Sequence, residues 1–127
     1  MGASNLIPAL DVEVELLKAF RRFLRTQQLI GVAPPIMVLV SLLGVRDCSL
    51  DTRHHSRAAM WATYPFERDH LIIPGAIVDS FDADRGSVFK PIFEVLWNAG
   101  GFPRCLDYKE EGALNIDPSR FQGEFVM

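Results

Sequence analysis

The segment CSLDTRHHSR, residues 48–57, contains the densest group of chemically reactive side chains in the chain. It holds one of the two cysteines, two of the three histidines and two arginines. Such side chains can bind a metal ion, contact the phosphates of a nucleic acid, or lie in a solvated loop between strands. The sequence favours the solvated loop, and the other two interpretations stay open as alternatives.

A metal site in this region would use Cys48, His54 and Cys105. Zinc requires three or four Cys, His or carboxylate ligands that converge on one point. His54 and His55 are adjacent, so their side chains diverge in a strand or a helix, and no Cys-x-x-Cys or His-x-x-x-His pair supports them. The chain also lacks a P-loop, a Gly-x-Gly-x-x-Gly and a Gly-x-Ser-x-Gly motif. We therefore expect no metal ion and no cofactor, with Cys48, His54 and Cys105 as the alternative ligand set.

A basic cluster in the same region is the candidate nucleic-acid contact. Its members are Arg46, Arg53, His54, His55 and Arg57. Asp47 and Asp51 offset part of this charge, and the net charge of -3 argues against a general nucleic-acid coat. Weak nucleic-acid binding through the loop 46–57 is therefore an alternative function.

Acidic residues in the C-terminal half suggest a second alternative, a metal-dependent nuclease or hydrolase. The tripeptide DYK, residues 107–109, matches a fragment in which the acid binds magnesium and the lysine steadies the attacking water. The candidate catalytic residues are Asp82, Asp84, Asp107 and Lys109. The tripeptide is common by chance, so we expect a non-enzymatic protein ahead of an enzyme.

Composition indicates one soluble globular domain. The chain has 127 residues, of which 49% are hydrophobic and 23% charged. Its N-terminus lacks the basic start of a signal peptide, and acidic residues interrupt the apolar ones. The longest apolar run, from Ala33 to Val45, contains two prolines, a serine and a glycine, and is too short for a membrane helix of ~20 residues. We expect a cytoplasmic protein with reduced thiols and no membrane partner.

The clearest predicted element is a helix over residues 11–30. Asp11 is the expected N-cap, and Gly31 with Pro34-Pro35 the stop. Its predicted inward face consists of Val12, Leu16, Phe20, Phe23, Leu24 and Gln27. The continuous apolar run 36–45 then predicts a central strand covered on both faces.

Further strands are predicted over 58–66 and 70–74, with residues 46–57 as a long hairpin loop between strands. A second helix is expected from Ser87, its predicted cap, to Gly100-Gly101, with Pro91 near its first turn. Its predicted inward face is Val88, Ile92, Val95, Leu96 and Ala99. The expected fold is α+β, with a small, mainly antiparallel sheet of about three strands packed against two main helices. Residues 1–127 are expected to form one domain, with a compact core at 10–105 and a C-terminal extension at 106–127.

Three stretches carry a resemblance to a known family: PPIMVLVSLLGV, DHLIIPGAIVDSF and KPIFEVLWNAGGFPRC. Together they resemble the C-terminal accessory region of bacterial Schlafen/AlbA-type proteins, which are described as DNA-binding or ATP-binding. The resemblance covers roughly residues 10–105. The Schlafen/AlbA domain itself lies N-terminal to this region in those proteins and is absent here, so the resemblance assigns no site residue.

The leading functional hypothesis is therefore an accessory or interaction domain. The resemblance implies an exposed apolar surface where the missing domain would lie, and dimerisation would cover such a surface. We expect a protein partner or a homodimer, in a nucleic-acid-related bacterial system.

Overall fold

The computed structural model describes residues 5–55 and 64–122. Within them the chain forms two α-helices, α1 (Ala9–Leu29) and α2 (Arg85–Ala99). Its strands are β1 (Leu6–Pro8), β2 (Ile36–Leu43), β3 (Ser49–Asp51) and β4 (His70–Val78), and a 3-10 helix spans Pro118–Phe121. β1 pairs with β3 in parallel, and β2 pairs with β4 antiparallel. The predicted α+β class, with a small sheet packed against two helices, is confirmed.

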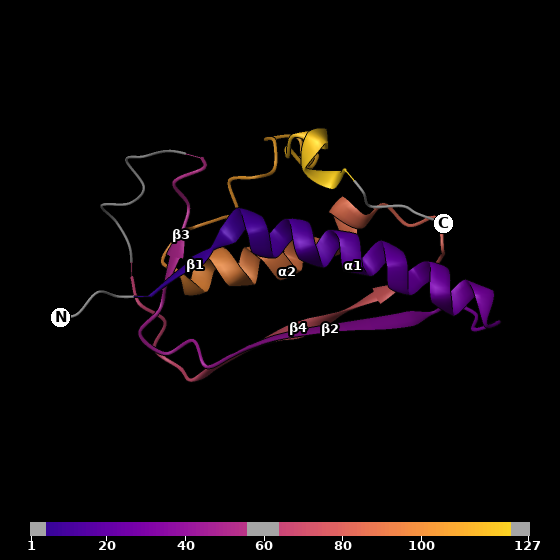
Figure 1. The fold of residues 1–127 in the computed structure, drawn as a ribbon, viewed down its shortest axis with the longest axis horizontal. Coiled ribbons are helices and arrows are strands. Elements are labelled where there is room, and N and C mark those ends of the chain that lie inside the picture. Colours follow the sequence, from indigo (N-terminus) through magenta and orange to yellow (C-terminus); the bar gives the residue numbers. More distant parts are fainter. Residues whose placement is uncertain (1–4, 56–63, 123–127) are drawn as a thin grey trace.

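The β2–β4 pair forms a layer on one side of the molecule, with the two helices on the other (Figure 1). The pairing shifts register between Val38 and Val40, which face Ala76 and Ile73 on β4. β4 therefore has an extra residue in this interval, which contains Pro74 and Gly75. A bulge tolerates a proline because it interrupts the ladder of hydrogen bonds, so β4 continues past Pro74 and Gly75 to Val78.

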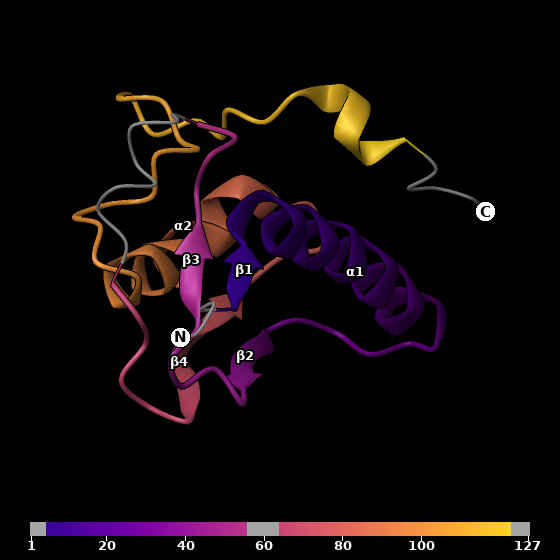
Figure 2. The same ribbon diagram turned by 60° about the vertical axis from the view of Figure 1, so that its left-hand side comes forward.

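The helices lie side by side above this layer, and α1 extends beyond α2 (Figure 1). Figure 2 shows the short β1–β3 pair next to the start of α1. α1 begins at Ala9 with Pro8 as its N-cap, so the prediction of Asp11 as the cap is wrong. Pro8 is extended and precedes the first helical residue, so α1 begins two residues earlier than expected.

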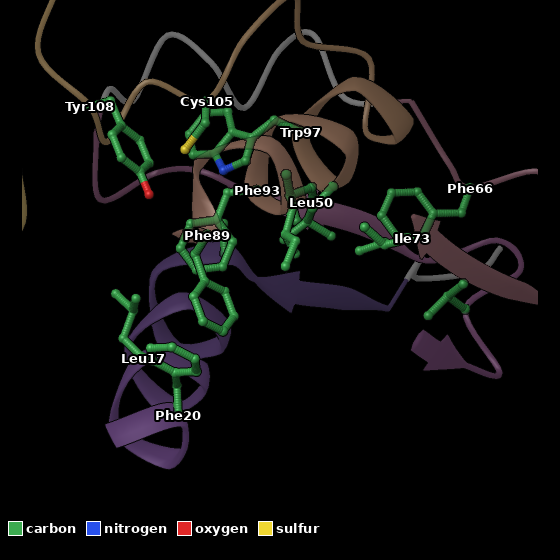
Figure 3. Close-up of a cluster of buried hydrophobic side chains, with 14 of the residues drawn as sticks. Leu17, Phe20, Leu50, Phe66, Ile73, Phe89, Phe93, Trp97, Cys105 and Tyr108 are labelled. Atoms are coloured by element: carbon green, nitrogen blue, oxygen red, sulfur yellow. The ribbon is translucent and has the colours of Figure 1, made fainter. Parts of the chain in front are cut away.

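The core lies between the two helices and the inner face of the β2–β4 pair (Figure 3). Phe89, Phe93 and Trp97 of α2 are at most 2% exposed, and Phe20 of α1 meets Phe89 edge-on, with ring centroids 5.2 Å apart. Such aromatic contacts stabilise a core by about 0.5–1.5 kcal/mol beyond the apolar area they bury. α2 is thus the central element of the fold.

The predicted inward faces are correct only in part. On α2, Ile92 and Leu96 are buried as expected. The helix also buries Phe89, Phe93 and Trp97, because it lies between α1 and β4 and is covered on two sides. On α1 the buried residues are Ala9, Glu13, Val14, Leu17 and Phe20. Phe23 is 64% exposed, since the second half of α1 extends past the core.

Four further expectations need correction. β2 is not covered on both faces, because its residues alternate between half-buried and exposed. The predicted hairpin loop 46–57 contains a strand, β3, which pairs with the unpredicted β1. Ser87 is not the cap of α2: its backbone N–H and its hydroxyl donate to the Asp84 carboxylate, which caps the helix. Pro91 is the seventh residue of α2 and lies beyond the first turn.

The predicted strand 58–66 falls mostly outside the described residues. Its described end, Pro65, forms an isolated antiparallel bridge with Ser49. Within the described residues, no helix has the length and apolar character needed to cross a membrane.

Candidate functional site

A buried cluster of ionisable side chains lies where α1, α2 and two connecting segments meet. α1 contributes Glu13 and α2 contributes Trp97, while Cys105 and Asp107 come from the segment that follows α2. His54 joins them from the turn after β3. Glu13 and Cys105 are 0% exposed and Asp107 is 4% exposed. Burial of this many polar groups is costly unless they bind one another or a ligand.

Glu13 accepts two hydrogen bonds on one oxygen. Trp97 Nε1 donates to Glu13 Oε2 at 2.7 Å, and Cys105 Sγ lies 3.7 Å from the same oxygen. The second oxygen, Oε1, is buried without a hydrogen-bond donor. A buried acceptor in this condition costs about 1–3 kcal/mol unless it carries a proton or binds a ligand.

Asp107 forms the other half of the cluster through His54. The His54 Nε2 atom lies 2.8 Å and 3.0 Å from the two carboxylate oxygens of Asp107. The His54 side chain is 19% exposed and that of Asp107 only 6%, so the imidazole lies between the buried carboxylate and the surface. The backbone holds Asp107 in place as well, because its carbonyl accepts a hydrogen bond from Asn115 at 2.7 Å.

The two carboxyl groups have opposite protonation states at neutral pH. Burial, together with the nearby Asp107, raises the pKa of Glu13 to about 9. Burial also acts to raise the pKa of Asp107, but the hydrogen bonds from His54 and Glu13 outweigh it and hold this pKa below its usual value. Glu13 is therefore a neutral acid and Asp107 an anion, so one proton lies between the two groups.

Cys105 is a thiol in this environment. Burial raises its pKa well above the usual range, with the carboxyl of Glu13 contributing in the same direction. A buried thiol of this kind is a weak nucleophile. The cluster therefore does not resemble a cysteine-protease site. Its side chains are instead suited to sharing a proton or to binding a ligand.

An open groove of about 640 Å³ reaches the cluster from the surface at His54. Charged side chains of both signs line it, including Asp11, Asp51, Arg53 and Arg120. His54 is thus the one member of the cluster that also borders this groove. It connects the buried carboxylates to solvent.

The structure brings together residues that were assigned to two different alternatives. His54 and Cys105 came from the alternative metal set, and Asp107 from the alternative catalytic set. Within residues 5–55 and 64–122, the side chains of metal-binding residue types that converge on one point are those of Glu13, Cys105 and Asp107. Cys48 is not among them.

The other candidate catalytic residues have different surroundings. Asp84 caps α2, and the backbone N–H of Asp82 bonds to the side chain of Ser80. Neither acid belongs to the convergent group with Asp107. The backbone of Lys109 forms a turn with Ala113 and Gly112.

The basic cluster is largely paired with acids. Arg46 contacts Asp69 at 2.8 Å, and Arg53 contacts Asp51 at 2.8 Å. His54 bonds to Asp107, while His55 is exposed. Arg57 lies outside the described residues. Nearby carboxylates thus neutralise much of the positive charge that a phosphate contact would need.

Sequence reasoning did not identify Glu13 as a site residue. A signal was present in the spacing. Ala9, Glu13, Leu17 and Phe20 recur at intervals of four, four and three residues, which places Glu13 within an apolar stripe of the helix. An acid in such a stripe is buried and needs a partner.

A second notable feature is the outer sheet face, which we define as the exposed aliphatic side chains of the β2–β4 pair. They are Met37, Leu39, Leu43, Ile72 and Ile77. Gly75 lies under this face, where a Cβ atom would come within 2.8 Å of Leu39 Cδ2. The glycine therefore lets Leu39 lie across the pair.

Comparison with protein-family models, with curated proteins and with solved structures finds no match to this chain. The resemblance to the Schlafen/AlbA-type accessory region therefore stays a prediction.

Proposed function

We propose that this chain is a non-enzymatic accessory domain that pairs with a second copy of itself through the outer sheet face. The observation that carries this proposal is the exposure of five aliphatic side chains on one face of a two-stranded sheet. Each of them is 53–75% exposed. An antiparallel sheet with one solvated face normally presents polar residues there, so an apolar face indicates a surface that is covered in use.

The area of the outer sheet face suits a dimer. Five aliphatic side chains at these exposures present on the order of 600 Å² of apolar surface, which is the size of the largest patches on monomeric proteins. A standard interface buries about 800 Å² on each partner. Closing the outer sheet face would therefore supply most of the apolar part of such an interface.

A second copy fits this face better than a partner with a charged surface. No Asp, Glu, Lys or Arg occurs in β2 or β4, and His70, the cross-strand partner of Leu43, is the one ionisable residue of the two strands. Two sheets stack face to face about 10 Å apart by interdigitating side chains. A symmetric pair needs only a face that complements itself, and this arrangement is the commonest among soluble oligomers.

The resemblance to the Schlafen/AlbA-type accessory region supports the same assignment. In those proteins the region contacts a further domain, and the resemblance therefore implies an apolar contact surface. On this view the pair would act in a nucleic-acid-related bacterial system, as a structural or regulatory component.

The test is sedimentation velocity on the chain and on two lysine variants. Ile72→Lys places a charge in the outer sheet face, and Leu29→Lys places the same charge at the last residue of α1, where the leucine is equally 75% exposed. Burying one isoleucine contributes about 1.5–3 kcal/mol, and symmetry doubles this contribution. We expect Ile72→Lys to weaken pairing at least about 100-fold and Leu29→Lys to leave it unchanged. Equal behaviour of the two variants would contradict the proposal.

A further inference from the structure

The buried cluster has the composition of a metal site as well as that of a proton-sharing pair. One thiol, two carboxyl groups and one imidazole meet in this cluster, and none of them belongs to the outer sheet face. Glu13, Cys105 and Asp107 each offer one ligand atom, and these atoms all lie within 4.8 Å of one another. They come from two separate parts of the chain, so the fold itself brings them together.

The distances suit a small ion after a modest contraction. Zinc binds carboxylate oxygen at about 2.0–2.2 Å and thiolate sulfur at about 2.3 Å, so tetrahedral ligands lie roughly 3.3–3.8 Å apart. The present separations of up to 4.8 Å require side-chain movements of about an ångström. Rotations of Glu13 and Cys105 would supply such movements without a change in the backbone.

An independent observation points to a missing ligand. Glu13 is 0% exposed, and its Oε1 atom has no donor among its neighbours, while Oε2 already accepts from Trp97 and Cys105. Native proteins rarely leave a buried carboxyl oxygen in this condition. Either a proton or a cation must fill the space between this oxygen and Asp107.

We propose that Glu13, Cys105 and Asp107 form a binding site for a divalent cation of the zinc class. Sulfur in the ligand set favours zinc over magnesium or calcium, which prefer oxygen ligands alone. His54 acts on the ion through Asp107, as an outer partner that orients this carboxylate.

The groove at His54 gives the ion a path to the cluster. His54 borders both the groove and the Asp107 carboxylate, so rotation of one imidazole would open the route. The remaining coordination position would be filled by water. The site thus combines buried ligands with one exchangeable position.

The experiment uses cobalt(II) as a probe for zinc on the full chain, after metal removal with EDTA and exchange into chelator-free buffer. A cobalt–thiolate bond gives a strong near-ultraviolet charge-transfer band, and tetrahedral cobalt gives visible bands. We expect one equivalent of cobalt to produce both and zinc to abolish them. Cys105→Ser keeps a hydrogen-bond donor beside Glu13 but removes the sulfur, so it should lose the charge-transfer band. Cys48→Ser is the matched control, because Cys48 is the other free cysteine and lies outside the cluster.

A second measurement, the melting temperature, uses the unaltered chain and so does not depend on whether a variant folds. Zinc at a hundredfold excess over its dissociation constant should raise the melting temperature of the unaltered chain by roughly 10 °C, and magnesium should not. No cobalt band together with no zinc shift would overturn the proposal and leave a proton as the only occupant. Loss of the band in Cys48→Ser instead of Cys105→Ser would also overturn it.

Discussion

Glu13→Gln should remove most of the pH dependence of stability between pH 6 and pH 8. The pKa of Glu13 is raised to about 9 in the folded chain, against 4.5 in the unfolded chain. A raised pKa gives stability that is complete below pH 4.5 and is lost progressively as the pH rises to about 9. The loss follows a slope of up to about 1.4 kcal/mol per pH unit. Between pH 6 and pH 8 the unaltered chain should lose about 2–3 kcal/mol.

Glutamine copies the protonated acid. Its carbonyl can accept from Trp97, and its amide group can donate to Asp107 in place of the Glu13 proton. The variant therefore keeps the hydrogen bonds of the neutral acid but cannot titrate. Relative to the unaltered chain, Glu13→Gln should gain about 2–3 kcal/mol between pH 6 and pH 8.

This pH window isolates Glu13 from the other shifted groups. The pKa of Asp107 is lowered, so its contribution changes only at acid pH, and the pKa values of Cys105 and Tyr108 are raised from values of 9.0 and 10.0. Urea denaturation at pH 6, 7 and 8, with EDTA and at one protein concentration, measures the free energy of unfolding. Glu15→Gln is the control, because Glu15 lies on the same helix with a 71% exposed side chain. Parallel pH profiles for the chain and Glu13→Gln would refute the reasoning.

Two further predictions concern single contacts in the core, and a third concerns the outer sheet face. Gly100→Ala should destabilise the chain by about 1–3 kcal/mol in urea denaturation, because the new Cβ would lie 2.9 Å from the Cβ of buried Leu50; an unchanged midpoint would show that the site relaxes. Tyr108→Phe should cost about 1 kcal/mol in the same assay, since the hydroxyl donates to the Gly86 carbonyl at 2.6 Å. In sedimentation experiments, sodium chloride should leave the pairing of two copies unchanged and sulfate should strengthen it. Sulfate is excluded from apolar surface and so favours its burial, whereas sodium chloride weakens ion pairs, on which this interface does not depend. Weaker pairing in sodium chloride would argue against the outer sheet face.

The two helices and two of the strands were predictable because their patterns are local. The helix over 11–30 and the apolar runs at 36–45 and 70–74 correspond to α1, β2 and β4. The positions of these elements can be predicted from the periodicity of their apolar residues and from the residues that begin and end each element. The pairing of β1 with β3 was not predictable in this way, since each strand has only three residues.

Burial was harder to predict than element type. The continuous apolar run at 36–45 suggested a strand covered on both faces, yet the helices cover only the inner face of this sheet and Leu39 is 71% exposed. Hydrophobicity alone does not distinguish a buried face from a face that binds a partner.

The buried cluster shows why separate motifs are weak guides to a site. His54, Cys105 and Asp107 were each recognised as reactive, but in different alternative sets. Glu13 was not among the candidates. Their convergence depends on how α1 and α2 pack, because Trp97 and Glu13 are separated by 84 residues in the sequence. Only the tertiary structure places them together.

The most direct test of the proposed function is the mass of the unaltered chain in solution. Static light scattering, measured from low micromolar to several hundred micromolar concentration, reports whether one or two copies are present. The account predicts a mass that rises to twice 14.3 kDa over this range, with a dissociation constant of roughly micromolar order. A mass of 14.3 kDa at every concentration would contradict it.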